Sequence, residues 1–455
     1  MTVCRQEAEN TVLSADLFLG DQHFTAENTL PNRHAEYEKE CERLLAVALY
    51  DCFVRASGYV PPWGILTGVR PAKLYARLAA QGEEAANRWF CEALKVQRHK
   101  IDLCRDTVRG ENAVTALSRP DSFSLYLSVP FCPSRCSYCS FVSHSIDRAK
   151  GLIPQYVALL CEELRQTAAI AKQCALRLET VYIGGGTPTS LTAEQIALLM
   201  QTVREGFDCS FLREFTVEAG RPDTVTKEKL LAIRDNGGTR ISINPQTMND
   251  AVLQEIGRRH TAAQTEEAFA LARACGFRNI NMDLIAGLPG DTPAGFRETL
   301  RRVLALDPEC VTVHSLAMKR ASALSTGGRF PEAEAGAAAE EMVEYARAKL
   351  AEAGFSPYYM YRQSKTVGNL ENVGYAKPGF EGLYNVFTMD ETHTVLACGA
   401  SAVSKLRQPG GAYIERIFNY KYPYEYIDRH AELMKRKAGI VDFYRRYGLA
   451  EKKES

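Results

Sequence analysis

The chain lacks an apolar run long enough to cross a membrane, and it lacks net charge. It has 455 residues, with 55 basic and 55 acidic side chains. A membrane-spanning helix needs ~20 consecutive apolar residues, so no membrane span is expected. Zero net charge gives no overall attraction for nucleic acid. The first residues are polar and acidic, which predicts no signal peptide. Internal repeats and low-complexity segments are also absent.

The chain also lacks the cysteine density of a disulfide framework, because 14 cysteines are spread through 455 residues. Eleven are scattered and are interpreted as buried free thiols. The other three, Cys132, Cys136 and Cys139, form a C-x3-C-x2-C run. They supply one thiolate fewer than an ordinary [4Fe–4S] cluster needs. One iron is then left open for a small molecule, usually S-adenosylmethionine, which indicates radical chemistry carried by a cofactor.

Zinc is the weaker alternative for this run of cysteines. Zinc sites use pairs of cysteines with a fourth Cys or His nearby, and His144 lies five residues beyond Cys139. The motifs described below favour the iron–sulfur cluster. Free thiols and an oxygen-sensitive cluster predict a reducing, cytoplasmic location.

The pattern of apolar residues predicts an α/β protein with three domains. Residues 1–112 should form an N-terminal α+β domain, residues 113–320 a barrel, and residues 321–455 a C-terminal α+β domain covering the barrel mouth. Strand and helix patterns alternate six times in the middle region, which favours a partial (β/α)6 TIM-like barrel. The expected strands are Phe123–Val129, Glu179–Ile183, Glu214–Glu218, Thr239–Ile243, Asn279–Leu284 and Val311–His314.

Each expected strand runs into a polar or glycine-rich segment, and in barrels the chemistry lies at the carboxyl ends of strands. Glycines at 184–186 would let backbone carbonyls approach the amino group of S-adenosylmethionine. Arg258 could pair with its carboxylate, and ribose hydroxyls could bind Glu218, Gln246 or Asp283. Each polar residue alone could be an ordinary surface group, but together they predict one site.

At these residues the chain resembles a known family. Leu125–Cys139, Gly184–Thr189 and Asp283–Pro289 are similar to the radical S-adenosylmethionine enzymes of the oxygen-independent coproporphyrinogen III oxidase group. Three further segments resemble the coproporphyrinogen dehydrogenase branch of HemZ type: Gly64–Pro71, Tyr361–Gln363 and Gly368–Tyr375.

The resemblance implies a partial barrel of six strand–helix units with an added C-terminal domain. It implies that Cys132, Cys136 and Cys139 ligate the cluster. It also implies that the S-adenosylmethionine site is lined by Tyr126, Tyr138, Gly185, Gly186, Thr187, Glu218, Gln246, Arg258, Asp283 and Ala317, with Val403 a weaker candidate.

The implied reaction is oxidative decarboxylation of two propionates of coproporphyrinogen III to vinyl groups, which gives protoporphyrinogen IX in haem biosynthesis. An electron donor such as flavodoxin or ferredoxin is implied as a partner. The chain departs from the best-known branch at Phe141, where that branch has a fourth cysteine, and at Ser128, where it has histidine. Haem chaperones also lack that cysteine, so a haem-binding protein is the alternative, and another tetrapyrrole substrate stays open.

The four propionates of such a substrate need local cations, because a carboxylate leaving water needs charged partners. Arg320 follows the sixth expected strand, and Arg362 lies in a tyrosine-rich stretch that could cover the barrel. We expect at least one of these two arginines to bind a non-reacting propionate in a bidentate pair.

Overall fold

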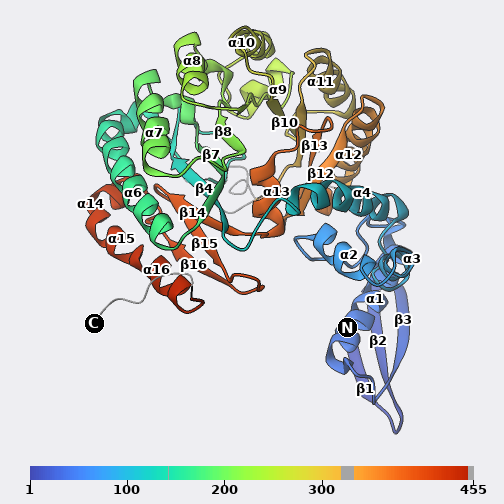
Figure 1. Cartoon of the computed structure of the whole chain (residues 1–455). Coiled ribbons are helices and arrows are strands. Elements are labelled where there is room, and N and C mark those ends of the chain that lie inside the picture. Colours follow the sequence, from blue (N-terminus) through green and yellow to red (C-terminus); the bar gives the residue numbers. More distant parts are fainter. Residues whose placement is uncertain (142, 319–332, 449–455) are drawn as a thin grey trace. The chain divides into compact units, whose positions relative to one another are not determined.

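The computed structural model describes residues 1–141, 143–318 and 333–448. The chain divides into two compact units (Figure 1). The first comprises Met1–Val108 together with Met360–Arg362, and the second comprises Arg109–Tyr359 and Gln363–Ser455. No helix among the described residues is long and apolar enough to cross a bilayer.

The first unit begins with a three-stranded antiparallel sheet. Its strands β1 (Thr2–Gln6), β2 (Asn10–Leu19) and β3 (Gln22–Pro31) follow one another in order. The long helix α1 (Tyr37–Ser57) packs on this sheet, and Ala15, Ala48 and Cys52 are fully buried between them. The remaining elements of this part of the chain are α2 (Pro71–Ala79), α3 (Glu83–Arg88), the π-helical turn Trp89–Ala93 and α4 (Arg98–Thr115).

The second unit is built on one open sheet of eleven strands. Its order is β12-β13-β11-β10-β9-β8-β7-β4-β14-β15-β16. Six strands match the expected alternation of strands and helices: β4 (Ser122–Val129), β7 (Arg177–Gly185), β8 (Glu214–Glu218), β9 (Arg240–Ser242), β10 (Ile280–Ala286) and β11 (Cys310–Ser315). Within this set, neighbouring strands pair in parallel. Their near-continuous burial is typical of parallel strands covered on both faces.

Helices alternate with these strands and lie around the outside of the curved sheet (Figure 1). Thr192 and Thr261 each form the capping box expected from the sequence, with Gln195 and Gln264, because their side chains satisfy free backbone N–H groups of the first turn. Thr292 caps a helix that begins at Pro293. These outer helices are α6 (Ile153–Gln173), α7 (Ala193–Gly206), α8 (Lys227–Asp235), α10 (Ala262–Ala274) and α11 (Pro293–Ala305), with the short α9 (Asp250–Glu255) between α8 and α10.

The C-terminal part of the chain extends the same sheet at both edges. On one edge β13 (Glu371–Ala376) pairs antiparallel with β11 and is followed by β12 (Ser356–Arg362). On the other edge β14 (Thr394–Cys398) pairs in parallel with β4 and is followed by β15 (Val403–Arg407) and β16 (Ile414–Phe418). The C-terminal helices are α12 (Ala333–Glu352), α13 (Leu383–Asp390), α14 (Pro423–Asp428), α15 (His430–Arg436) and α16 (Ala438–Arg445).

A buried ion pair joins the barrel to the C-terminal helices. Glu163 of α6 and Lys437 lie 2.9 Å apart, and their side chains are 0% and 1% exposed. The Glu163 carboxylate also accepts hydrogen bonds from the Gly399 N–H, the Tyr426 hydroxyl and the Asn419 amide. Since the remaining polar atoms of the pair are satisfied in this way, the two charges can be held inside the protein.

Replacing Lys437 with Met should lower the free energy of unfolding by about 3–5 kcal/mol, because it leaves the Glu163 carboxylate buried without its counter-ion. The matched control is Lys349→Met on α12, whose ion pair with Glu352 is exposed and should contribute little, because water screens the two charges. Urea unfolding of the two variants gives the comparison. Equal losses in both would contradict the role of the buried pair.

Candidate functional site

The carboxyl ends of the parallel strands gather the residues that the sequence singled out. Ser128 of β4 lies opposite Gly184 of β7, and Glu218 of β8 lies opposite Ser242 of β9. Gln246 follows β9 and forms a bridge with Leu284, directly after Asp283 of β10. Parallel pairing places all these strand ends at the same end of the barrel, as expected for a barrel site.

The loop after β4 carries the three cysteines. It begins with the short strand β5 (Phe131–Cys132), which pairs with β6 (His144–Ser145), and it continues into α5 (Ile146–Ala149). The Ser137 N–H donates to Ile256 O at 3.0 Å, and the Ser134 hydroxyl donates to Gly257 O at 3.0 Å. The loop is therefore fixed to the segment that follows α9.

Glycines at the end of β7 allow that strand to approach the cysteine loop closely. A Cβ on Gly186 would come within 2.7 Å of Phe131 O, and Gly185 has a φ of +110°. The Gly186 and Thr187 N–H groups donate to Val129 O and Phe131 O, both at 2.8 Å. Any larger residue at 186 would force the two backbones apart.

The three thiols have different hydrogen-bond donors. The Thr187 hydroxyl donates to Cys132 Sγ at 3.5 Å, and Arg221 Nη1 donates to Cys136 Sγ at 3.7 Å. Burial raises the pKa of Cys139 to about 11. A bound metal would deprotonate such a thiol outright.

This set of sulfur donors fits an iron–sulfur cluster better than a single ion. Within residues 1–141, 143–318 and 333–448, no three His, Cys, Asp or Glu side chains are placed to bind one metal ion. A [4Fe–4S] cluster does not require its three cysteines to meet at one ion, because each thiolate binds a different iron. His144, the fourth ligand of the zinc alternative, stacks edge-on against Tyr422 and Tyr424.

Two carboxyl groups at the strand ends have pKa values shifted in opposite directions. Burial raises the pKa of Glu218 to about 7, although the Tyr182 hydroxyl donates to its carboxylate at 2.5 Å. Burial would also raise the pKa of Asp283, but hydrogen bonding and charge from His314, with further hydrogen bonds, hold it below its usual value. Asp283 is therefore ionised at neutral pH, while Glu218 is close to its midpoint.

A tyrosine cluster surrounds Glu218, and most of this cluster could not be predicted from the sequence. Tyr126 was expected at this site, but Tyr182 and Tyr384 were not. The Tyr182 and Tyr384 rings stack at 4.5 Å, and Tyr126 lies 6.3 Å from Tyr182 and 6.2 Å from Tyr384. Tyr384 comes from α13, so the C-terminal part of the chain contributes to this site. The position of α13 beside Tyr182 could not be inferred from the sequence without the fold.

Gln246 and Arg258 carry buried polar atoms without partners. Gln246 has a φ of +67°, an uncommon value for a residue with a side chain, and its Oε1 makes no hydrogen bond. Arg258 donates through Nη1 to Asn244 O at 2.5 Å, while its Nε makes none. A strained backbone and unpaired buried atoms together are typical of a ligand site, so these two residues fit a polar cofactor. Tyr138 is half-buried beside Arg258 and hydrogen-bonds to it.

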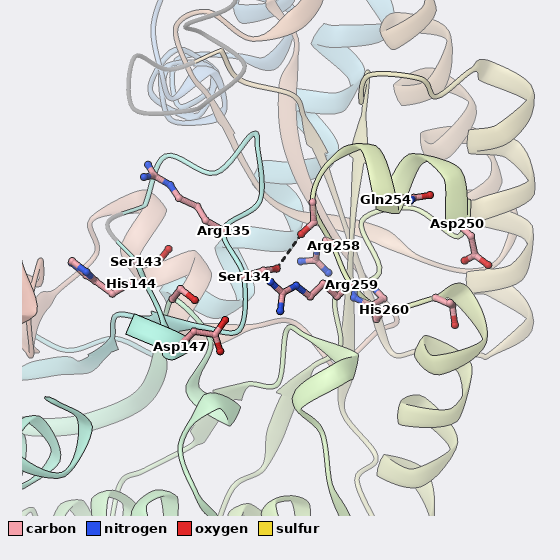
Figure 2. A pocket seen from close by; sticks show the side chains of 13 residues that line it. Ser134, Arg135, Ser143, His144, Asp147, Asp250, Gln254, Arg258, Arg259 and His260 are labelled. Carbon is pink, nitrogen blue, oxygen red and sulfur yellow. Dashed lines mark hydrogen bonds between the residues drawn. The ribbon is translucent and has the colours of Figure 1, made fainter. Parts of the chain in front are cut away.

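A cavity of about 1070 Å³ lies between the cysteine loop and the segment after α9 (Figure 2). Arg258 lines it, and so do Ser134, Arg259 and His260. His260 is buried, neither of its ring nitrogens has a hydrogen-bond partner, and burial lowers its pKa to about 3. This cavity could not be predicted from the sequence, because the two segments that form its walls are more than 100 residues apart in the chain.

The remaining expected residues lie elsewhere or outside the described residues. Ala317 forms an isolated bridge with Thr366, and Val403 begins β15. Arg362 groups with the first unit, where its guanidinium donates to Leu66 O and lies 5.0 Å from the Trp63 ring centre. Arg320 lies outside the described residues. Binding of a substrate carboxylate by either arginine stays a prediction.

The Radical SAM superfamily model matches residues 126–303. The oxygen-independent coproporphyrinogen-III oxidase-like protein HemZ of Bacillus subtilis is 36% identical, over 93% of this chain and 89% of that protein. The heme chaperone HemW of Bacillus subtilis is 33% identical, over 66% of this chain and 77% of HemW.

Among solved structures, the coproporphyrinogen III oxidase HemN of Escherichia coli, described as a radical SAM enzyme, has a TM-score of 0.56. It is 24% identical and covers 71% of this chain and 72% of its own. At that identity the likeness supports the partial-barrel fold alone. The superfamily match and the relative that spans nearly the whole chain lead to one assignment. The chain belongs to the radical SAM superfamily, in the group of oxygen-independent coproporphyrinogen III oxidase-like proteins, which use a [4Fe–4S] cluster and S-adenosylmethionine.

Proposed function

We propose that the protein catalyses the oxygen-independent oxidative decarboxylation of coproporphyrinogen III to protoporphyrinogen IX. The main observation in support is the 36% identity to the HemZ coproporphyrinogen-III oxidase-like protein, which extends over 93% of the chain. The match to heme chaperone HemW covers only 66%. This difference in coverage favours an enzyme of the HemZ type.

When bound, the reduced cluster and S-adenosylmethionine supply a carbon-centred radical that can remove a hydrogen atom from a substrate propionate. The propionate would then become a vinyl group by losing carbon dioxide and passing one electron to a one-electron acceptor. The chain's own contribution is binding and orientation. Cys132, Cys136 and Cys139 would hold the cluster. Glu218 and Asp283 would accept hydrogen bonds from ribose hydroxyls, and Arg258 would pair with the methionyl carboxylate.

The substrate itself carries four carboxylates, which need cationic partners inside the protein. Arg320 remains our candidate for one such contact. Arg362 is a weaker candidate, because its guanidinium already contacts Leu66 and Trp63. An electron donor such as flavodoxin or ferredoxin would supply the electron that starts each cycle.

A haem chaperone is the second candidate function. Phe141 stands where the best-known oxidase branch has a fourth cysteine, and HemW is 33% identical over two thirds of the chain. A chaperone would bind haem without converting a propionate. The two functions therefore differ in product as well as in ligand.

Anaerobic incubation of the reconstituted protein with S-adenosylmethionine, reductant and coproporphyrinogen III should yield the mono- and divinyl products, resolved by mass. Cys132→Ala protein is the control and should yield neither. Stoichiometric haem binding, together with no change in the mass of coproporphyrinogen, would overturn the enzyme proposal in favour of the chaperone.

Cys→Ala at position 132, 136 or 139 should abolish cluster assembly, because each substitution removes one of the three thiolate ligands. The control is Cys161→Ala on α6, a buried free thiol that should leave the iron and sulfide content unchanged. Chemical analysis and visible absorbance after reconstitution give both values. Loss of iron in Cys161→Ala would contradict the ligand assignment.

Binding of S-adenosylmethionine should weaken as the pH falls below 7. The pKa of Glu218 is raised to about 7, so the ionised fraction of its carboxylate falls from about nine tenths at pH 8 to about one tenth at pH 6. Calorimetry at pH 6 and pH 8 should show affinity roughly tenfold lower at pH 6. In Glu218→Gln the affinity should be lower at pH 8 and nearly independent of pH. An unchanged pH dependence in that variant would exclude Glu218 as the titrating group.

A further inference from the structure

Arg221 is a buried arginine that the sequence did not single out, and it reaches one cluster ligand. It follows β8, three residues after Glu218, and is 3% exposed. Its Nη1 lies 3.7 Å from Cys136 Sγ. The Arg258 guanidinium is a second cation beside that thiol. The other two thiols have uncharged donors: the hydroxyls of Thr187 and Ser143 for Cys132, and the backbone N–H of Phe141 for Cys139.

The same guanidinium is fixed by four further hydrogen bonds. Nε and Nη2 donate to the two carboxylate oxygens of Asp223 at 3.1 and 3.2 Å, a bidentate pair. Nη1 and Nη2 donate to Ser134 O and Oγ at 3.3 and 3.0 Å. Because a planar guanidinium with this many partners cannot rotate freely, its position beside Cys136 is defined.

Asp223 is the counter-ion of Arg221. Its carboxylate is 18% exposed and lies 3.8 Å from Nδ1 of His260, which lines the cavity (Figure 2). A positive and a negative group therefore follow one another outward from the cluster ligand: Arg221 first, then Asp223.

Charges this close to a cluster act on its reduction potential. The reduced cluster carries one more negative charge than the oxidised cluster, so a buried cation hydrogen-bonded to a ligand sulfur stabilises the reduced state more. An anion behind that cation opposes this effect. Such groups around the ligands tune metal centres even though they do not bind the metal.

We propose that the Arg221–Asp223 ion pair sets the reduction potential of the cluster through Cys136, with Arg221 raising it and Asp223 lowering it. Arg221 is thus a positioning residue that acts through a ligand. The inference rests on the cluster alone and is independent of which tetrapyrrole, if any, the protein converts.

The test is an EPR-monitored redox titration of reconstituted protein without S-adenosylmethionine. Arg221→Met should shift the midpoint potential to a more negative value, by about the 59 mV that corresponds to a tenfold change for one electron. Arg221→Lys should shift it less, because the charge is kept. Asp223→Asn should shift it to a more positive value. The control is Arg273→Met on α10, which removes a comparable ion pair with Glu309 and should leave the potential unchanged.

The opposite signs separate this role from a structural one. If Arg221 only fastened the cysteine loop, both variants would lose iron, or both potentials would move in the same direction or not at all. Either result overturns the proposal. If Arg221→Met does not retain iron, Asp223→Asn decides: a positive shift at full iron content supports the proposal, and any other result overturns it.

Discussion

Parallel hydrogen bonding from β14 through β4 to β11 places the carboxyl ends of seven strands at the same end of the barrel. The cysteine loop, the glycine end of β7, Glu218, Gln246 and Asp283 all depend on this register. A shift of one residue in any pair would turn the corresponding side chain to the opposite face. The site is thus a property of the sheet more than of any single motif.

The sheet is shared between the barrel and the C-terminal part of the chain. β13 and β14 pair with the two outermost strands of the six-strand set. Tyr384 of α13 stacks on Tyr182, and Lys437 pairs with Glu163 inside the protein. The C-terminal segments therefore complete both the hydrogen bonding of the sheet and the surroundings of Glu218.

Features determined by neighbouring residues could be predicted from the sequence. The six strands, the two capping boxes and the helix starting at Pro293 depend on local patterns of apolar, capping and proline residues, and the structure has all of them. Contacts between distant segments could not be predicted. Arg221 meets Cys136 across 85 residues, and β14 meets β4 across about 270. No spacing rule relates such residues, because only the folded sheet brings them together.

The pairing of β4 with β14 has a consequence for synthesis on the ribosome. β4 leads directly into the cysteine loop, yet its neighbour at 394–398 is translated some 260 residues after Cys139. At about 5–20 residues per second, this edge of the nascent sheet stays unpaired for roughly 13–50 s. The three thiols therefore emerge from the ribosome well before the sheet around them is complete. Iron must either be delivered after the barrel is finished or be bound by an unfinished barrel.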